Sequence, residues 1–252
     1  MDIFSTQKKQ SQLESKSPNN NNNNNNMSLP PFNEFISSQT SLSQKIKVID
    51  ILFEHSDSLI FFILKHKVFK IANDQDIGNV LRDSKDGKSN IIMIDTYPKY
   101  IELVRQRLLT IVDLAEQEGI SSFKIDHLTD IIGSHPRLGG SSSNKTCANT
   151  LNGGTEDISI HSLNEQKSLN SKDDPETNKK LIALNDEYES RYEGLKFVCF
   201  VNGRTRAKII QIMESRINSG NSWFDEVRIG INEMCDIAID RAKKYTDNKQ
   251  YL

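Results

Sequence analysis

The chain has 252 residues, a formal net charge of −2 at pH 7 and three cysteines. This near-balance of charge gives no electrostatic reason to bind nucleic acid or an anionic membrane, so we expect small polar molecules as partners. The apolar runs are too short to cross a bilayer, and no apolar N-terminal h-region is present. The odd set of widely spaced cysteines, Cys147, Cys199 and Cys235, favours a reducing compartment.

The ends and the middle of the chain differ in composition. Residues 1–31 include eight consecutive asparagines and almost no apolar side chains, so we expect a disordered tail. Residues 32–245 contain enough Leu, Ile, Val and Phe for one core and are expected to form a single domain. Within it, residues 140–160 are rich in Ser, Asn, Thr and Gly, which is typical of a disordered insertion. Residues 246–252 are expected to form a C-terminal tail.

Capping residues and apolar periodicity indicate the first helices. Ser41 and Gln44 fit a capping box in front of a helix that ends near Glu54. A second helix is expected to begin at Ser56 or the next residue, and the tight link between the two predicts that they lie antiparallel. Residues 74–81 indicate a minor helix.

Two further helices lead to the first group of polar residues. A long helix begins beside Pro98, which a first turn tolerates, and Gly119 is expected to stop it. The next helix is expected to carry Phe123 on its inner face and to close at Gly133. His135 therefore follows just after a helix end.

The C-terminal third begins with a helix expected over residues 175–193. Residues 196–201 alternate weakly between apolar and polar, and because no partner strand is evident we interpret them as an extended connector. Asn202 and Gly203 form a turn signal after it.

Two helices complete the chain, over residues 204–217 and from Trp223 to about Lys244. The last one places Arg241 at the end of an apolar stripe. With seven to eight helices and no convincing sheet, the sequence predicts an all-α, single-domain helical bundle with long polar loop insertions.

His135 and Pro136 are the first candidate for chemistry. Proline excludes the α region for the residue before it, so His135 should project extended from a helix end. The negative end of the helix dipole favours imidazolium there, and we expect the pKa of His135 to be raised from about 6.5. Facing Glu165, it would donate and accept a proton near neutral pH. The alternative is that His135 caps carbonyl groups of its own helix.

Ser162, Glu165 and Gln166 are the second candidate. A hydroxyl, a carboxylate and an amide on one helical turn suit a small ligand rich in N–H and C=O groups. Alternatively, Ser162 and Glu165 form a capping box, and both readings hold together if the cap fixes the turn that aims Gln166. No His and Cys residues have the spacing of metal ligands, and no phosphate loop, dinucleotide fingerprint or nucleophile elbow is present.

Taken in order, these motifs resemble those of the 2-oxo-4-hydroxy-4-carboxy-5-ureidoimidazoline (OHCU) decarboxylases of the urate degradation pathway. The resemblance covers about residues 32–245. It rests on six segments, which are residues 52–56, 134–139, 162–166, 184–188, 197–204 and 238–241. The spacer between the first two polar groups is longer here than in that family.

The resemblance implies an all-helical carboxy-lyase, usually dimeric and without a cofactor, that removes carbon dioxide from OHCU and delivers (S)-allantoin. It implies that His135 and Glu165 are catalytic. The substrate-binding positions that it implies are Pro136, Ser162, Leu163, Asn164, Gln166, Phe197, Val198, Cys199, Phe200, Val201 and Arg241.

Two alternatives belong to other classes of protein. A binding or regulatory module that kept the helical scaffold would have no physical need for the polar set of His135, Glu165, Gln166 and Arg241. A metal-dependent hydrolase of ureides would need ligands that the spacing does not supply. We expect an intracellular protein, cytoplasmic or peroxisomal, although residues 250–252 are not a Ser-Lys-Leu type of address.

Overall fold

The computed structural model describes residues 28–65, 94–119, 123–139 and 175–247. These residues form eight α-helices and one π-helical turn, without a strand, so the prediction of an all-α domain is confirmed. Most of the expected N-terminal tail, the minor helix over 74–81 and the insertion over 140–160 lie outside the described residues. The elements are α1 (Phe32–Ile36), α2 (Leu42–Leu52), α3 (Asp57–Ile60), η1 (Phe61–Lys65), α4 (Tyr97–Glu118), α5 (Phe123–Gly133), α7 (Pro175–Arg191), α8 (Arg206–Ile217) and α9 (Trp223–Asp247).

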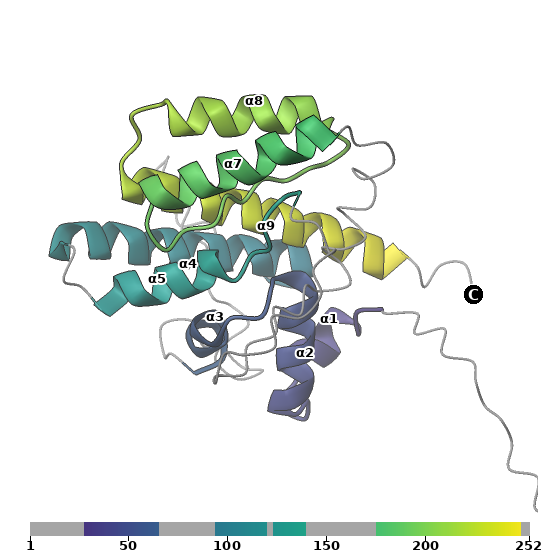
Figure 1. The fold of residues 1–252 in the computed structure, drawn as a ribbon. Helices are drawn as coiled ribbons and strands as arrows, with labels where there is room; N and C mark the ends of the chain where they lie inside the picture. Colours follow the sequence, from purple (N-terminus) through teal and green to yellow (C-terminus); the bar gives the residue numbers. More distant parts are fainter. Residues whose placement is uncertain (1–27, 66–93, 120–122, 140–174, 248–252) are drawn as a thin grey trace, which may run out of the picture.

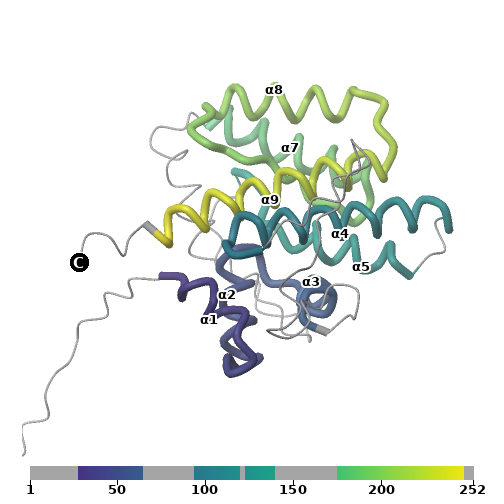
Figure 2. Tube along the Cα trace, turned by 180° about the vertical axis from the view of Figure 1, so that it is seen from behind, coloured from purple at the N-terminus to yellow at the C-terminus, as the bar shows by residue number. Residues whose placement is uncertain are grey.

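Helix α9 lies at the centre of the bundle. It packs against α4, α5 and α2, while α7 and α8 pack against each other. Figure 1 shows the α7 and α8 pair above α9, the α4 and α5 pair below it, and α1, α2 and α3 lower still, and Figure 2 shows the same order from behind. The apolar stripe expected on α9 is buried, which fixes the rotation of this helix in the core (Val227, Ile231, Met234 and Ala238).

The local signals for helix ends are confirmed. The side chain of Ser41 accepts the backbone N–H of Gln44, and the side chain of Gln44 accepts the N–H of Ser41. Gly119 ends α4 with a φ of +82°, a left-handed conformation that glycine adopts without a steric penalty. Asn202 and Gly203 also have positive φ angles, as the turn signal requires.

Helix α3 is held by α5. Ser56 Oγ donates to Asp130 Oδ2 at 2.7 Å, and the backbone N–H of Ser58 donates to the same oxygen at 3.0 Å. Ser58 Oγ lies 2.9 Å from His127 Nδ1. Helix α3 therefore packs against α5 and crosses the direction of α2 (Figure 1). The expected antiparallel pairing of these two helices is wrong because side-chain bonds to α5 decide the direction of α3.

Two further expectations are corrected at the ends of elements, and one short helix was missed. Leu29, expected in the tail, is buried, and the carbonyl of Pro30 accepts a hydrogen bond from Tyr97 Oη at 2.9 Å. Helix α1 was not predicted, because its five residues are too few for a periodic pattern. Its residue Phe35 packs on Tyr97 with ring centroids 5.5 Å apart. Phe123 is 64% exposed and does not enter the core, since it lies on the first turn of α5.

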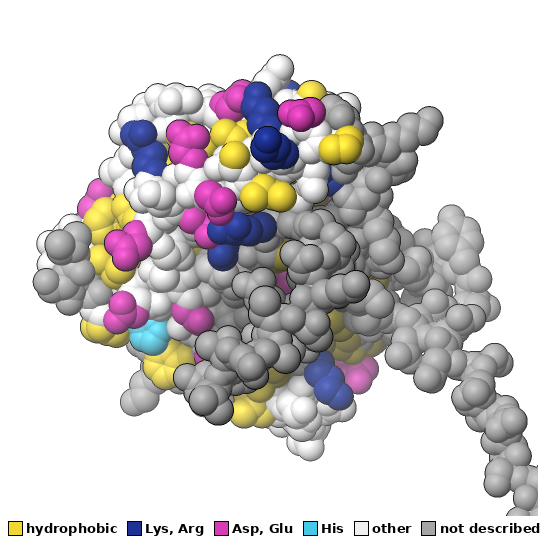
Figure 3. Space-filling model, viewed as in Figure 1, with side chains coloured by type: hydrophobic (Ala, Val, Ile, Leu, Met, Phe, Trp, Pro, Cys, Tyr) yellow, Lys and Arg dark blue, Asp and Glu magenta, His cyan; other side chains and the backbone are white. Residues whose placement is uncertain are grey.

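The surface mixes both signs of charge. On the face seen in Figure 3, Lys and Arg side chains are interspersed with Asp and Glu, and no large patch of one sign forms there. None of the described helices is both long and apolar enough to cross a bilayer.

Candidate active site

A buried ion pair joins the end of α2 to α9. Glu54 follows two residues after α2, and its Oε1 lies 2.9 Å from Nη2 of Arg241, with the two side chains only 6% and 2% exposed. Nη1 of Arg241 lies 3.5 Å from the carbonyl oxygen of Ile51. Because an unpaired charge in such a site would be costly, each partner requires the other. Arg241 is thus engaged within the protein before any ligand arrives.

His135 lies buried just beyond the end of α5. The backbone N–H groups of Ser134 and His135 bond back to Asp130 O at 3.1 Å and Ile132 O at 3.3 Å, so the main chain finishes the helix. Nε2 of His135 is buried and has no hydrogen-bond partner among the described residues. A buried polar atom left in this way indicates a place for a polar ligand. Nε2 therefore does not cap the carbonyl groups of α5.

The electrostatic expectation for His135 is wrong. Burial lowers the pKa of His135 from its ordinary 6.5 to about 4, while the charge of Glu54 acts to raise it and the charge of Arg241 to lower it. The loss of hydration outweighs the dipole of α5, because the imidazole is taken out of water almost completely. His135 is consequently neutral at neutral pH. A neutral imidazole can accept a hydrogen bond at one ring nitrogen and donate one from the other.

The loop after His135 is fastened to α7. Arg137 makes two parallel bonds to Glu189, at 2.7 and 2.8 Å, and contacts Asp186 at 2.9 Å. Nδ2 of Asn185 donates to the carbonyl oxygen of Leu138 at 2.9 Å. Bidentate arginine pairs fix geometry as well as charge. The backbone on either side of His135 is therefore fixed, by α5 before it and by the bonds of Arg137 and Leu138 to α7 after it.

The connector between α7 and α8 has the extended, unpaired form that the sequence predicts. Phe197, Val198 and Cys199 are buried, while Phe200 and Val201 are half-buried. Burial raises the pKa of the Cys199 thiol, so this side chain stays uncharged and serves as a small hydrophobe. The same holds for buried Cys235, whose pKa is raised to about 12.

The structure brings some of the expected site residues together. His135 and Arg241 share one charged environment with Glu54, and Pro136 is half-buried beside His135. The second polar group lies outside the described residues, so its meeting with His135 remains a prediction (Ser162, Leu163, Asn164, Glu165 and Gln166).

Glu54 is a site residue whose role is not evident from the sequence. In the sequence it marks only the expected end of a helix and one member of the segment over residues 52–56. Arg241 stands in an apolar stripe, where a buried guanidinium needs a carboxylate partner. Glu54, next to the buried Phe53 at a helix end, is a carboxylate in an equally apolar setting. A buried guanidinium at Arg241 and a carboxylate in an apolar segment at Glu54 together predict this ion pair.

No group of three or more His, Cys, Asp or Glu residues within the described ranges is arranged to hold a metal ion. The described part of the site holds one neutral imidazole and one guanidinium in a setting withdrawn from water, and such groups can serve proton transfer and charge recognition.

The model of one protein family matches residues 88–243, and its description is OHCU decarboxylase. The match covers more than half of the chain. It includes His135, Glu165, the connector and Arg241, and it begins after Glu54. No curated protein gives a significant match to the chain.

Proposed function

Because the chain belongs to the OHCU decarboxylase family of carboxy-lyases, we propose that it converts OHCU to (S)-allantoin in urate degradation, without a cofactor. The family accounts for decarboxylation. The observation that carries the finer proposal is the buried, neutral His135, whose Nε2 has no partner among the described residues, beside the charges of Glu54 and Arg241.

The reaction needs little beyond orientation and one proton. The bond between the ring carbon and the carboxylate breaks, carbon dioxide leaves, and the bonding electrons pass into the adjacent ring C=N. The ring nitrogen of that C=N takes up one proton from solvent, which balances the carbon dioxide lost. The hydroxyl proton is released as its carbon becomes a carbonyl, and the neighbouring carbon gains a proton. Since the substrate carries its own electron sink, the protein has to hold the bond in line, exclude water and move this proton.

His135 is the group proposed to move the proton. As a neutral imidazole, it accepts the hydroxyl proton and returns it to one face of the ring, which sets the chirality of the product. Glu165 is proposed as the second catalytic residue, and Gln166 as its partner in holding ring and ureido N–H groups. Arg241, oriented by Glu54, is proposed to contact a substrate oxygen.

The other contacts are proposed from the family's pattern. Pro136 would border the ring next to His135, Ser162, Leu163 and Asn164 would form the turn before Glu165, and the connector over residues 197–201 would cover the ligand. We also propose an intracellular homodimer, which sedimentation of the purified chain would test.

The function is tested by generating OHCU in situ from urate and following optically active allantoin. We expect the protein to accelerate the reaction and to give one enantiomer, against a slow, racemic background. His135→Ala and Glu165→Ala should each lower turnover by a factor of about 100 or more. His55→Ala is the matched control, because this imidazole is 61% exposed and pairs with Asp50. A rate no faster than background would refute the proposal and favour the binding or regulatory module.

A further inference from the structure

The connector has an unusual set of hydrogen-bond partners. Within the described parts of the chain, no backbone group of residues 196–200 bonds to another backbone group, although Phe197, Val198 and Cys199 are buried. Buried N–H and C=O groups are nearly always paired. Two of the residues in this segment are instead held by charged side chains.

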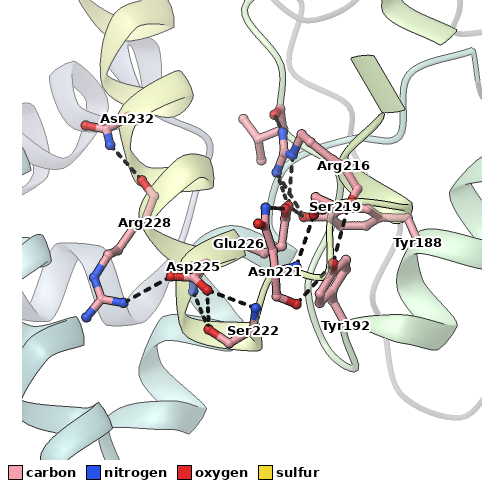
Figure 4. Close-up of polar contacts among 11 residues, drawn as sticks. Tyr188, Tyr192, Arg216, Ser219, Asn221, Ser222, Asp225, Glu226, Arg228 and Asn232 are labelled. Atoms are coloured by element: carbon pink, nitrogen blue, oxygen red, sulfur yellow. Dashed lines mark hydrogen bonds and ion pairs between the residues drawn. The ribbon is translucent and has the colours of Figure 1, made fainter. Parts of the chain in front are cut away.

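Arg216 of α8 holds the carbonyl of Val198. Its Nη1 donates to that oxygen at 2.8 Å, and its guanidinium lies 4.6 Å from the ring centroid of Phe197. Figure 4 shows how Arg216 is itself fixed: Nε and Nη2 donate to Oε2 of Glu226 at 2.8 and 2.5 Å, and Nη2 also donates to Tyr188 Oη at 3.0 Å. Tyr188 Oη in turn donates to Glu226 at 2.6 Å. The guanidinium thus has one available orientation.

A second ion pair holds Phe200. Its backbone N–H donates to Oε2 of Glu233, on α9, at 2.6 Å. Its carbonyl accepts a hydrogen bond from Nη1 of Arg204 at 2.5 Å. Arg204 and Glu233 are themselves 4.0 Å apart. Both backbone polar groups of Phe200 are therefore held by one pair of opposite charges.

In an extended chain the backbone groups of alternate residues face the same side. Val198 and Phe200 bond to Arg216 and Glu233, whereas the backbone N–H and C=O of Cys199, between them, make no hydrogen bond to any described residue, as expected if they face the other way. We propose that Arg216 and Glu233 are positioning residues for substrate: they hold the connector from one side so that it meets the ligand from the other. This inference rests on the proposed function, and neither side chain is assigned a contact with the substrate.

Glu233 gives the sharper test of the two. The Arg216 side chain is 9% exposed and pairs with the fully buried Glu226. Replacing Arg216 would leave the carboxylate of Glu226 buried without this ionic partner and would unfold the protein. The side chain of Glu233 is 25% exposed. Glu233→Ala removes the acceptor for the N–H of Phe200, whereas Glu233→Gln keeps an oxygen that accepts the same bond. Glu214→Ala is the matched control, because it removes an equal charge from an exposed pair with Lys180 on the same half of the bundle.

Steady-state kinetics with OHCU generated in situ give the first readout. Glu233→Ala should raise KM about tenfold while changing kcat less than about threefold, because the connector contributes binding rather than proton transfer. Glu233→Gln should restore most of the wild-type KM, and Glu214→Ala should match the wild type. A purely structural role would instead lower the melting temperature and the active fraction without a selective change in KM.

Amide hydrogen exchange of the ligand-free, full-length protein gives the second readout. The N–H of Phe200 should exchange about tenfold faster in Glu233→Ala and near the wild-type rate in Glu233→Gln. An active wild type with unchanged KM or unchanged exchange in Glu233→Ala overturns this inference alone. A wild type without turnover overturns the proposed function and, with it, the substrate role of the connector.

Discussion

Glu54 and Arg241 are 187 positions apart in the chain, yet their side chains meet at 2.9 Å inside the core. This contact closes α2 against α9 and gives the neutral His135 two charged neighbours of opposite sign. It joins the stability of the fold to the electrostatics of the candidate site, so both respond to a change at either residue.

Glu54→Gln should therefore destabilise the protein strongly. Removing one partner of a buried pair costs about 3–5 kcal/mol, because the remaining charge loses its buried ionic partner. We expect a melting temperature roughly 10 °C lower in a thermal scan. Glu214→Gln, which breaks an exposed pair with Lys180, should cost less than about 1 kcal/mol. Equal losses in the two variants would mean that the Glu54 pair contributes no more than a surface contact.

His135 should make stability depend on pH in one particular window. Its pKa is about 4 when folded and 6.5 in the ordinary state, so between these values the unfolded chain binds the extra proton. The neutral form stabilises the fold above pH 6.5, and this contribution, on the order of 3 kcal/mol, is lost as the pH falls from 6.5 to 4.

Urea unfolding of the wild type and of His135→Gln at pH 7, 5.5 and 4 measures this effect. The difference in unfolding free energy between them should shrink as the pH falls. His55→Gln should keep the wild-type dependence, because His135 is intact in it. Parallel curves for the wild type and His135→Gln would contradict the lowered pKa.

The same lowered pKa predicts the acid side of the rate profile. If neutral His135 accepts the substrate's proton, kcat/KM should hold from pH 8 down to about pH 5 and fall as the pH approaches 4. The measurement follows (S)-allantoin formation above the uncatalysed rate at each pH. A midpoint near 6.5 would show that His135 titrates as it does in water and that its burial has been misjudged.

The contact between α5 and the end of α7 predicts a steric effect. Gly194 has a φ of +80°, and a Cβ there would lie 2.5 Å from Cγ2 of Thr129. Gly220 has a similar φ of +78° with open space around it. Both Gly→Ala changes carry the backbone strain of about 1–3 kcal/mol, but only Gly194→Ala adds a clash. Thermal unfolding should rank Gly194→Ala lower, and Thr129→Ser in the same chain should recover part of the loss. Equal effects of the two alanines would exclude the clash.

Much of this architecture follows from local rules in the sequence. The cap at Ser41, the stop at Gly119 and the apolar stripe of α9 depend on neighbours within a turn or two, and each is confirmed. The direction of α3 could not be obtained in this way. It depends on bonds from Ser56 and Ser58 to Asp130, more than seventy positions away.

The candidate site shows the same division. The sequence points to His135 and Arg241 because each is a polar residue in an unusual position. His135 follows just after a helix end, and Arg241 lies in an apolar stripe. The pKa of His135 was predicted in the wrong direction, because its burial depends on packing that no local pattern reports. The placement of Glu165 against His135 stays a prediction.

Helix α9 also limits where the chain can gain or lose residues. Glu226, Glu233 and Arg241 reach three different parts of the molecule from one continuous coil. One residue inserted among them would turn everything downstream by about 100° and advance it by about 1.5 Å, which would separate partners that no side-chain rearrangement could rejoin. Linkers between helices absorb extra residues at little cost. Homologues of this protein should therefore vary in the length of their loops but keep the number of residues in α9 constant.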